Sequence, residues 1–458
     1  MDIDSILNRV DTDLDASLDR LFELLKIPSI STDPAYTADC RRTAEHLAAD
    51  LATLGLHAEV RNTIGHPIVL AKSDGPDNRP HILFYGHYDV QPVDPLELWE
   101  TDPFAPRVAE RPDGSKMIVA RGAADDKGQV MTFVEALRAI KAVEGELPVK
   151  VTIMLEGEEE SGSPSLPGFF AEAKDELQAD AVFVCDTGMW DRDTPAITMS
   201  LRGNITITMT VRAADRDLHS GYFGGAARNP NSVVAKILAG LHDDAGRVTL
   251  PGFYDGVHEV DPRTLANWDS LGMTAGEFLG TVGLSKPAGE EGRSILELVW
   301  SRPTCEVNGM SGGYSGAGFK TVIPAEAQAK VSFRLVGTQD PAKIIEAFKA
   351  YAREMVPADC SVEFETHGSG PAIQVPADWP MLKTAQKVLA EEWQTQTAMI
   401  GVGGSIPIVH DFKTVLGMDA LLIGFGLEDD RVHSPNEKYD LKSFHKGIRS
   451  WARLLAAL

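Results

Sequence analysis

Apolar runs that alternate with helix-like segments constrain the fold of this 458-residue chain more than any other feature. Four short runs read as strands, at 81–85, 116–120, 149–155 and 180–185. Two segments repeat apolar side chains at helical spacing: 41–55, which precedes these runs, and 128–142, which lies between the second and the third. Strands that alternate with helices predict an α/β fold, in which helices flank a mixed, largely parallel sheet. The same character returns near the C-terminus, with a helix at 379–393, a strand at 419–425 and a final helix.

A segment of different character interrupts this pattern. Residues 204–213 alternate strictly between apolar and polar side chains, as a half-buried strand does. A strand at 325–337, a helix at 341–355 and a strand at 360–368 follow later in the chain. We therefore predict an inserted α+β domain at 204–370, and an α/β domain formed by 1–203 and 371–458. Within the insert, residues 244–300 contain helical pieces whose place in the fold the sequence leaves open.

The composition excludes several classes of partner. A formal net charge of −24 would repel a nucleic-acid backbone and an anionic membrane surface. We find no apolar run near the roughly 18 residues that suggest a membrane span, and no signal-peptide pattern at the N-terminus. The four cysteines are scattered without a CxxC pair, which favours free thiols in a reducing compartment. We therefore expect a cytoplasmic protein that binds neither nucleic acid nor membrane.

Histidine and acidic residues follow the predicted strands of the α/β domain. In an open α/β sheet, ligands bind outside the carboxyl ends of the strands, so these loops are expected to meet at one edge. Glutamates are especially dense in "LEGEEESGS" (155–163), where mutual repulsion favours a nearby positive charge. The side chains delivered in this way are His87 and Asp89, Asp125 and Asp126, Glu156, Glu158, Glu159 and Glu160, Asp186, and His433.

These side chains suit divalent metal ions at a catalytic site. Imidazole and carboxylate without thiolate favour zinc, manganese or cobalt. Five ligands exceed the need of one four-coordinate ion with an open position, but they serve two ions if one carboxylate bridges them. Paired ions about 3.5–4 Å apart are a common device for hydrolysis.

Six motifs in the same order resemble the co-catalytic di-zinc metallopeptidases, which include carnosinases, cytosolic non-specific dipeptidases, aminoacylases and glutamate carboxypeptidases. The resemblance covers nearly the whole chain, and its motifs are "GHYDVQPV", "RGAADDKG", "EGEEESGS", "CDTG", "DLHSGYFGG" and "RVHSPNEK". It implies that the α/β domain is catalytic and that the insert is a lid and dimerisation domain. It also implies two divalent ions per subunit, zinc first and manganese or cobalt as alternatives, together with a homodimer.

The resemblance also implies a role for each residue of the metal site. Asp125 would bridge the two ions, and the peptide after it would be cis. Asp89 would orient His87, whereas Glu159 would take a proton from the metal-bound water, which leaves a metal-bridging hydroxide, and deliver it to the leaving amine. The two remaining ligand pairs would be His87 with Asp186 and Glu160 with His433.

Residues of the inserted domain resemble the substrate contacts of the family. His219 would polarise the scissile carbonyl and reach the active site of the other subunit. Arg334 would bind the terminal carboxylate of the substrate through its guanidinium group. Four further residues would add hydrogen bonds to the substrate: Asn229, Thr321, Gly404 and Ser405.

The resemblance favours a dipeptidase that hydrolyses the peptide bond of small peptides. Residues 302–324 and the long insert resemble the carnosinase and non-specific dipeptidase branch, and the ligand Asp186 is more typical of dipeptidases than of deacylases. An N-acyl-amino-acid deacylase or a small carboxypeptidase remains the alternative. A non-catalytic binder on the same scaffold is a third hypothesis, which the presence of Glu159 disfavours.

Three acidic residues keep open interpretations at this point. Asp126 is a candidate N-cap for the helix that begins near Lys127. Glu156 and Glu158 have no role in the resemblance, and we expect a local hydrogen-bond partner and a solvated side chain for them.

Overall fold

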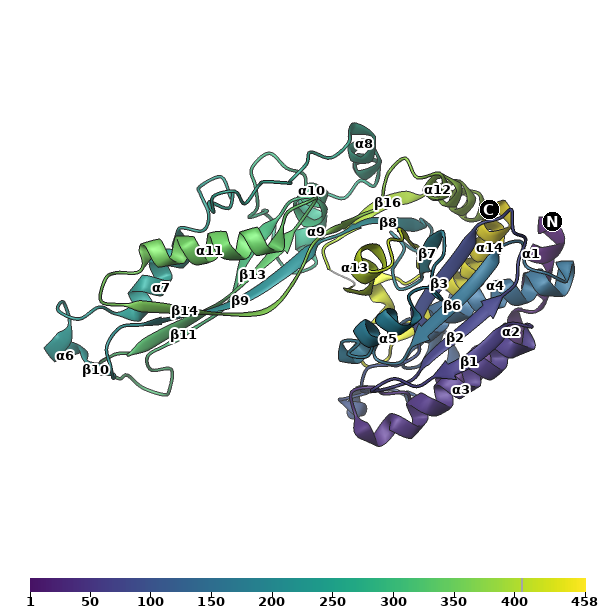
Figure 1. The fold of residues 1–458 in the computed structure, drawn as a ribbon, viewed down its shortest axis with the longest axis horizontal. Coiled ribbons are helices and arrows are strands. Elements are labelled where there is room, and N and C mark those ends of the chain that lie inside the picture. Colours follow the sequence, from purple (N-terminus) through teal and green to yellow (C-terminus); the bar gives the residue numbers. More distant parts are fainter. Residues whose placement is uncertain (405–406) are drawn as a thin grey trace. The chain divides into compact units, whose positions relative to one another are not determined.

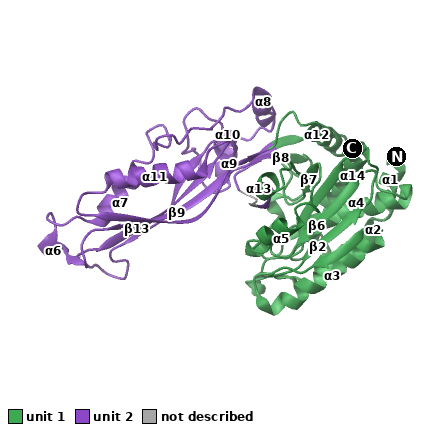
Figure 2. Cartoon of the chain, in the orientation of Figure 1, with its two compact units in different colours: residues 1–198, 375–399, 411–458 green, residues 199–374, 400–410 purple. Residues whose placement is uncertain are grey.

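The computed structural model describes residues 1–404 and 407–458, which form two compact units (Figure 2). Unit 1 comprises Met1–Thr198, Val375–Met399 and Asp411–Leu458, and unit 2 comprises Met199–Gln374 and Ile400–His410. Unit 2 therefore also takes a short segment from the C-terminal part of the chain, which the domain bounds predicted from sequence do not include. Each unit is described by itself below.

A mixed sheet forms the centre of unit 1 (Figure 1). Its central strands β6, β3, β7 and β17 are parallel, whereas β1, β2 and β8 pair antiparallel at the flanks, and this confirms the predicted α/β fold. The central strands are apolar over most of their length because helices cover both of their faces. The bounds are β1 (His57–Arg61), β2 (Ile68–Ser73), β3 (His81–His87), β6 (Lys150–Glu156), β7 (Ala181–Val184), β8 (Ala196–Leu201) and β17 (Ala420–Leu422). Two further strands, β15 (Ile373–Gln374) and β16 (Ala398–Val402), pair with β8.

Aromatic side chains hold helices against both faces of this sheet. Phe84 of β3 stacks on Phe133 of α4 at 3.9 Å between ring centroids, and both rings meet Trp451 of α14 edge-on. The next residue, Tyr85, points to the opposite face and contacts Phe412 of α13. The helices are α1 (Ile3–Thr12), α2 (Leu14–Leu25), α3 (Thr37–Thr53), α4 (Lys127–Glu144), α5 (Leu166–Ala173), α12 (Pro380–Trp393), α13 (Pro407–Thr414) and α14 (Leu441–Ala457).

One predicted strand lies outside the large sheet. Residues 116–120 contain β5 (Lys116–Val119), which belongs to a separate sheet of three strands. A turn in which Gly114 has a φ of 83° connects it to its antiparallel neighbour β4 (Arg107–Glu110). Its other edge pairs with β18 (Lys438–Asp440), which comes from the far end of the chain. The expectation that the Asp125 loop follows a strand of the parallel sheet is therefore wrong, because both edges of β5 are used elsewhere.

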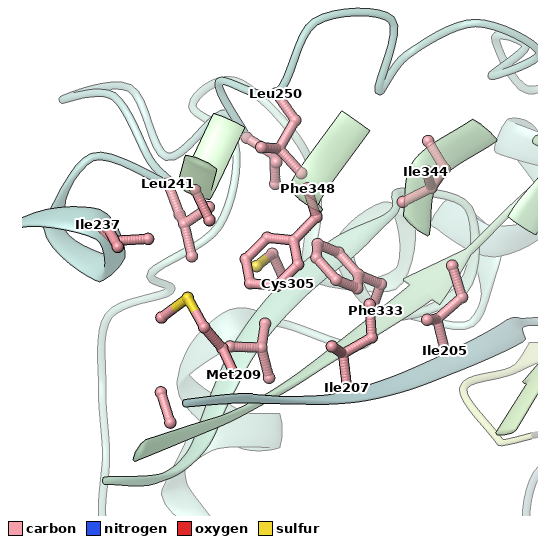
Figure 3. Close-up of a cluster of buried hydrophobic side chains, with 14 of the residues drawn as sticks. Ile205, Ile207, Met209, Ile237, Leu241, Leu250, Cys305, Phe333, Ile344 and Phe348 are labelled. Carbon is pink, nitrogen blue, oxygen red and sulfur yellow. The ribbon is translucent and has the colours of Figure 1, made fainter. Parts of the chain in front are cut away.

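Unit 2 contains an antiparallel sheet of four strands in the order β11-β13-β9-β14. Alternate side chains of β9 and β13 pack against α7 and α11, and Figure 3 shows Ile207, Met209 and Phe333 gathered with Phe348 in this cluster. The other face of the sheet carries polar side chains, as the strict alternation at 204–213 predicts. The strands are β9 (Gly203–Arg212), β10 (Leu218–His219), β11 (Thr304–Gly312), β12 (Val322–Ile323), β13 (Glu326–Leu335) and β14 (Ser361–Gly370). The helices are α6 (Ser220–Phe223), α7 (Pro230–Ala239), α8 (Pro262–Ser270), α9 (Ala275–Gly280), α10 (Ile295–Trp300) and α11 (Pro341–Met355).

Two other expectations concern the helices and the thiols. In the part of the chain that the structure describes, no helix combines the length and the apolar character that crossing a bilayer requires. The four cysteines are free thiols, three of them buried. Near the N-terminus, α1 ends and α2 begins at Asp13.

Candidate metal centre

Two groups of potential metal ligands lie side by side in unit 1. His87, Asp125 and Asp186 offer ligand atoms that all lie within 4.8 Å of one another, and Asp125, Glu160 and His433 form a second such group. Asp125 belongs to both groups: its Oδ1 lies 3.0 Å from Nε2 of His87 and its Oδ2 lies 2.9 Å from Nε2 of His433. The structure thus brings together the five residues predicted as ligands, with the predicted bridging residue between the two groups.

The ligands come from loops that local structure holds in place. His87 ends β3, and Asp186 follows β7, so two adjacent parallel strands deliver them to the same edge of the sheet. The peptide between Asp125 and Asp126 is cis, as the family resemblance implies. His433 has a φ of 61°, as does Asn436, so the loop that carries it turns through left-handed backbone.

Asp89 connects the first group to the glutamate loop. It is fully buried, and its backbone carbonyl lies 3.1 Å from Nδ1 of His87, which leaves Nε2 of that ring directed at Asp125. Its carboxylate accepts hydrogen bonds from the backbone N–H groups of Glu159 (3.3 Å) and Glu160 (3.0 Å). Asp89 therefore orients His87 and also fixes the loop that carries Glu159 and Glu160.

This cluster concentrates negative charge that its own histidines only partly balance. Burial, followed by the charge of Asp125, raises the pKa of Asp186 to about 7. Hydrogen bonds to Asp125 and Glu160 raise the pKa of His433 to about 10. For Asp125 burial acts in the opposite direction, but the hydrogen bonds from His433 and His87 hold its pKa below the usual range. Because a histidine binds a metal through a neutral nitrogen, protons would compete with a metal ion for His433.

The donor set fits divalent cations. Each group supplies one imidazole and two carboxylates without a thiolate, which is the chemistry that zinc, manganese and cobalt accept. The carboxylates whose charges oppose one another here would be stabilised by a cation, so the residues match the metal ions that the resemblance implies.

Glu159 lies beside this cluster but outside both ligand groups. Within the described residues its side chain makes no hydrogen bond or ion pair, and burial raises its pKa. Its neighbour Glu160 accepts a hydrogen bond of 2.6 Å from the amide of Gln91 and lies 3.3 Å from Nε2 of His433. The adjacent carboxylates therefore occupy different environments: Glu160 belongs to a candidate ligand group and Glu159 does not.

The other two glutamates of this loop have structural partners. Tyr85 donates a hydrogen bond of 2.5 Å to Glu156, whose pKa burial raises to about 8. Glu158 accepts from the backbone N–H groups of His66 (2.9 Å) and Ser165 (3.1 Å), and it is only 5% exposed. The expectation of a hydrogen-bond partner for Glu156 is confirmed. The expectation that Glu158 is solvated is wrong, because Glu158 is buried and joins the loops of His66 and Ser165.

Asp126 does not cap the helix that follows it. Although it occupies the N-cap position of α4, its side chain makes no capping hydrogen bond. Its Oδ2 instead accepts the backbone N–H of His87 at 3.1 Å, and the residue is fully buried. The expectation that Asp126 caps α4 is therefore wrong. Asp126 instead supports the end of β3, where His87 lies.

His219 belongs to unit 2 and has a defined ring tautomer. Its Nδ1 accepts a hydrogen bond of 2.9 Å from the backbone N–H of Gly221, so the ring proton of the neutral form lies on Nε2. The side chain is exposed, and its ring lies 4.7 Å from that of Tyr222. An exposed N–H donor is what a residue needs in order to polarise a carbonyl oxygen.

Arg334 lies on β13 and lines a cavity of about 770 Å³ within unit 2. Arg202 lines the same cavity, and its Nε donates to the carbonyl of Gly403 at 3.2 Å. Burial, followed by the charge of Arg334, lowers the pKa of Arg202 to about 10. The charge of Arg334 therefore disfavours the charged form of Arg202, which a bound carboxylate would relieve.

The four weaker candidates for substrate contacts divide by environment. Asn229 caps α7 by accepting from the N–H of Asn231 at 3.0 Å, so its side-chain oxygen already has a structural role. Thr321 and Gly404 are exposed, and the carbonyl of Thr321 accepts from the N–H of Ser220. Ser405 lies outside the described residues.

Two residues near the ligands were missed by sequence reasoning. Gln91 lies in "GHYDVQPV", and Glu437 lies in "RVHSPNEK", so both stand inside motifs that were recognised for other residues. Their contacts, with Glu160 and with the Asp125 loop, join segments distant in sequence and leave no local pattern.

Comparison with known proteins places the chain among peptidases. The profile of Peptidase family M20/M25/M40 matches residues 83–457. The "Cys-Gly metallodipeptidase dug1" of Schizosaccharomyces pombe is 30% identical over 465 residues, covering 98% of this chain and 97% of the relative. The "Beta-Ala-His dipeptidase" of Homo sapiens is 30% identical over 392 residues, covering 84% of this chain and 76% of the relative. Among solved structures, an M20 family metallo-carboxypeptidase from Sulfolobus solfataricus has a TM-score of 0.79 at 31% identity, covering 96% of this chain and 98% of that structure.

Proposed function

This chain belongs to peptidase family M20/M25/M40 and is a metal-dependent dipeptidase, and we propose that two divalent ions held by five side chains of unit 1 support the hydrolysis. The observation that carries the proposal is the position of Asp125, which belongs to both ligand groups, beside a glutamate that belongs to neither. The ligands would be His87 and Asp186 for one ion, Glu160 and His433 for the other, and Asp125 for both.

The protein residues would divide the reaction between them. When bound, paired divalent ions supply an activated water and polarise the scissile carbonyl. Glu159 would accept the proton of the attacking water and pass it to the nitrogen of the leaving amine. Asp89 would keep His87 and the loop of Glu159 in register during both transfers.

Residues of unit 2 would recognise the rest of the substrate. Arg334 would bind the terminal carboxylate of the peptide, and Nε2 of His219 would donate to the carbonyl oxygen as it gains charge. We propose that His219 acts on the active site of the partner subunit in a homodimer. Four further residues would add hydrogen bonds to the substrate. They are Thr321, Gly404, Ser405 and Asn229, the last through its side-chain NH₂ group.

We propose short peptides with a free terminal carboxylate as the substrate class and zinc as the first candidate metal. The relatives named for Cys-Gly and β-Ala-His peptides support a dipeptide substrate. The similarity to a metallo-carboxypeptidase favours release of a C-terminal residue from other short amides as the second candidate.

A dipeptide screen combined with elemental analysis tests this function. We expect purified protein to contain about two divalent ions per chain, to hydrolyse dipeptides, and to lose activity on chelation until metal is restored. N-acetyl amino acids and longer peptides serve as the comparison substrates. Turnover confined to acylated amino acids would overturn the proposed substrate class of short peptides.

Replacement of His219 by alanine is expected to lower kcat by about 10²–10³-fold, because one donor to the developing oxyanion is lost. Metal content should stay unchanged, since His219 belongs to neither ligand group. Mixing this variant with an inactive Glu159 variant tests the dimer: a partner that supplies the missing histidine would restore part of the activity. Mixed dimers that stay inactive would argue against action across subunits.

A further inference from the structure

Glu437 lies next to the candidate metal centre, and its carboxylate accepts four hydrogen bonds, yet it belongs to neither ligand group. It is fully buried, four residues after His433. Its Oε1 accepts from the backbone N–H groups of Ala124 (2.9 Å) and Asp125 (3.1 Å). Its Oε2 accepts from the N–H of Gly122 (3.0 Å) and from Nη1 of Arg121 (2.8 Å).

These contacts run along the loop that presents the shared ligand. Three of the four donors are backbone N–H groups between residues 122 and 125, so the carboxylate follows the path of the main chain up to Asp125. The carbonyl of Glu437 also accepts the N–H of Ala120 at 3.2 Å, where the loop leaves β5. Glu437 therefore contacts the backbone of this loop from Ala120 to Asp125.

Arg121 provides the charge that allows a carboxylate to stay buried here. Its side chain is 1% exposed, its Nη2 donates to the carbonyl of Pro92 at 2.9 Å, and its guanidinium lies 5.4 Å from the ring centroid of Trp99. A buried, fully paired carboxylate of this kind is costly to disturb, because loss of one partner leaves the other charge without compensation.

We propose that Glu437 is a positioning residue that holds the Asp125 loop in its ligand geometry and thereby sets the affinity for both metal ions. The proposal rests on the proposed role of Asp125 as the shared ligand. Because Glu437 and His433 lie on the same loop, the carboxylate also links two ligands that are 308 residues apart in the sequence.

A glutamine at this position cannot reproduce the contacts. Each oxygen of the glutamate accepts two hydrogen bonds, so an amide in either orientation would direct its NH₂ group at two donors. Glu437→Gln therefore keeps the size of the side chain but removes the acceptor on one side and the partner charge of Arg121. Glu437→Asp keeps the charge and shortens the side chain by one methylene group.

Glu392 offers a matched control in the same unit. It is 5% exposed on α12, and its carboxylate accepts from Nε of Arg449 and Nε of Arg453, each at 2.7 Å. Glu392→Gln therefore disturbs a buried ion pair of similar kind without touching a metal ligand.

The test is metal affinity, measured by competition with a chelator on folded protein, together with the visible absorption of the cobalt-loaded forms. We expect Glu437→Gln to bind metal about 10–100-fold more weakly and to change the cobalt spectrum, as loss of an outer-sphere partner does. Glu437→Asp should lie between this variant and the wild type, and Glu392→Gln should keep wild-type affinity even if its Tm falls.

The outcomes separate this proposal from the proposed function. Wild-type affinity and spectrum in Glu437→Gln would overturn the positioning role while two ions in the wild type still support the dinuclear site. If Glu437→Gln does not fold, Glu437→Asp decides: reduced affinity supports the role, and unchanged affinity overturns it. A wild-type protein that binds no pair of ions would instead refute the proposed function itself.

Discussion

Replacement of Glu159 by glutamine is expected to lower kcat by about 10²–10⁴-fold while both metal ions remain bound. The amide has the same shape as the carboxyl group but cannot accept a proton from the attacking water. Glu159 belongs to neither ligand group, so the substitution removes proton transfer and leaves the coordination intact. Initial rates and elemental analysis of the same preparation measure both parts of this expectation.

The neighbouring glutamate supplies the contrast. Glu160→Gln should lose metal as well as activity, because Glu160 belongs to the ligand group of Asp125 and His433. Glu159→Gln and Glu160→Gln therefore differ in metal content although they change adjacent side chains in the same way. Near-normal kcat in Glu159→Gln would show that another group accepts the proton.

Asp125→Asn is expected to weaken the binding of both ions, by more than the roughly 10–100-fold that loss of an outer-sphere partner causes. The reason is that both ligand groups include this carboxylate. Asp186→Asn should weaken only one ion, because Asp186 belongs to one group alone. Metal titration of the two variants by calorimetry would distinguish them: one site lost for Asp186→Asn and both for Asp125→Asn. Equal losses would argue against a bridging role for Asp125.

The α/β character of unit 1 was predictable because its central strands are buried on both faces. A short, continuous apolar run such as that of β6 is typical of a strand buried on both faces. Helices such as α4 are recognised because their apolar side chains recur at helical spacing. The return of the pattern after residue 371 showed that the chain comes back to the same domain. These features are local, so a single sequence contains them.

Pairing between distant segments was not predictable in this way. Residues 116–120 have the composition of an inner strand, yet β5 pairs with β4 and with β18, more than 300 residues away, and forms a separate sheet. The apolar run specifies a strand but not its neighbours, since the partners are decided by the whole fold. The motif nevertheless located Asp125, because its position in the sequence does not depend on the sheet that precedes it.

Ligand types were easier to predict than the residues that support them. Histidine and carboxylate at strand ends indicate metal chemistry from their identity alone, as for His87. Glu158 and Glu437 are acidic residues in polar motifs, and nothing in their local sequence indicates full or near-complete burial. Their environment is created by backbone N–H groups from loops elsewhere, so it emerges only in the folded chain.

The place of β17 in the sheet has a consequence for synthesis of the protein. This inner strand lies between β7 and β8, but it is translated after all of residues 199–374. In a nascent chain, β7 and β8 are therefore synthesised long before β17, the strand that lies between them in the finished sheet. His433 emerges later still, so the second ligand group cannot form on a partly made chain. Premature termination before this point would leave an open sheet edge and an incomplete metal site, whereas completion of the chain closes both.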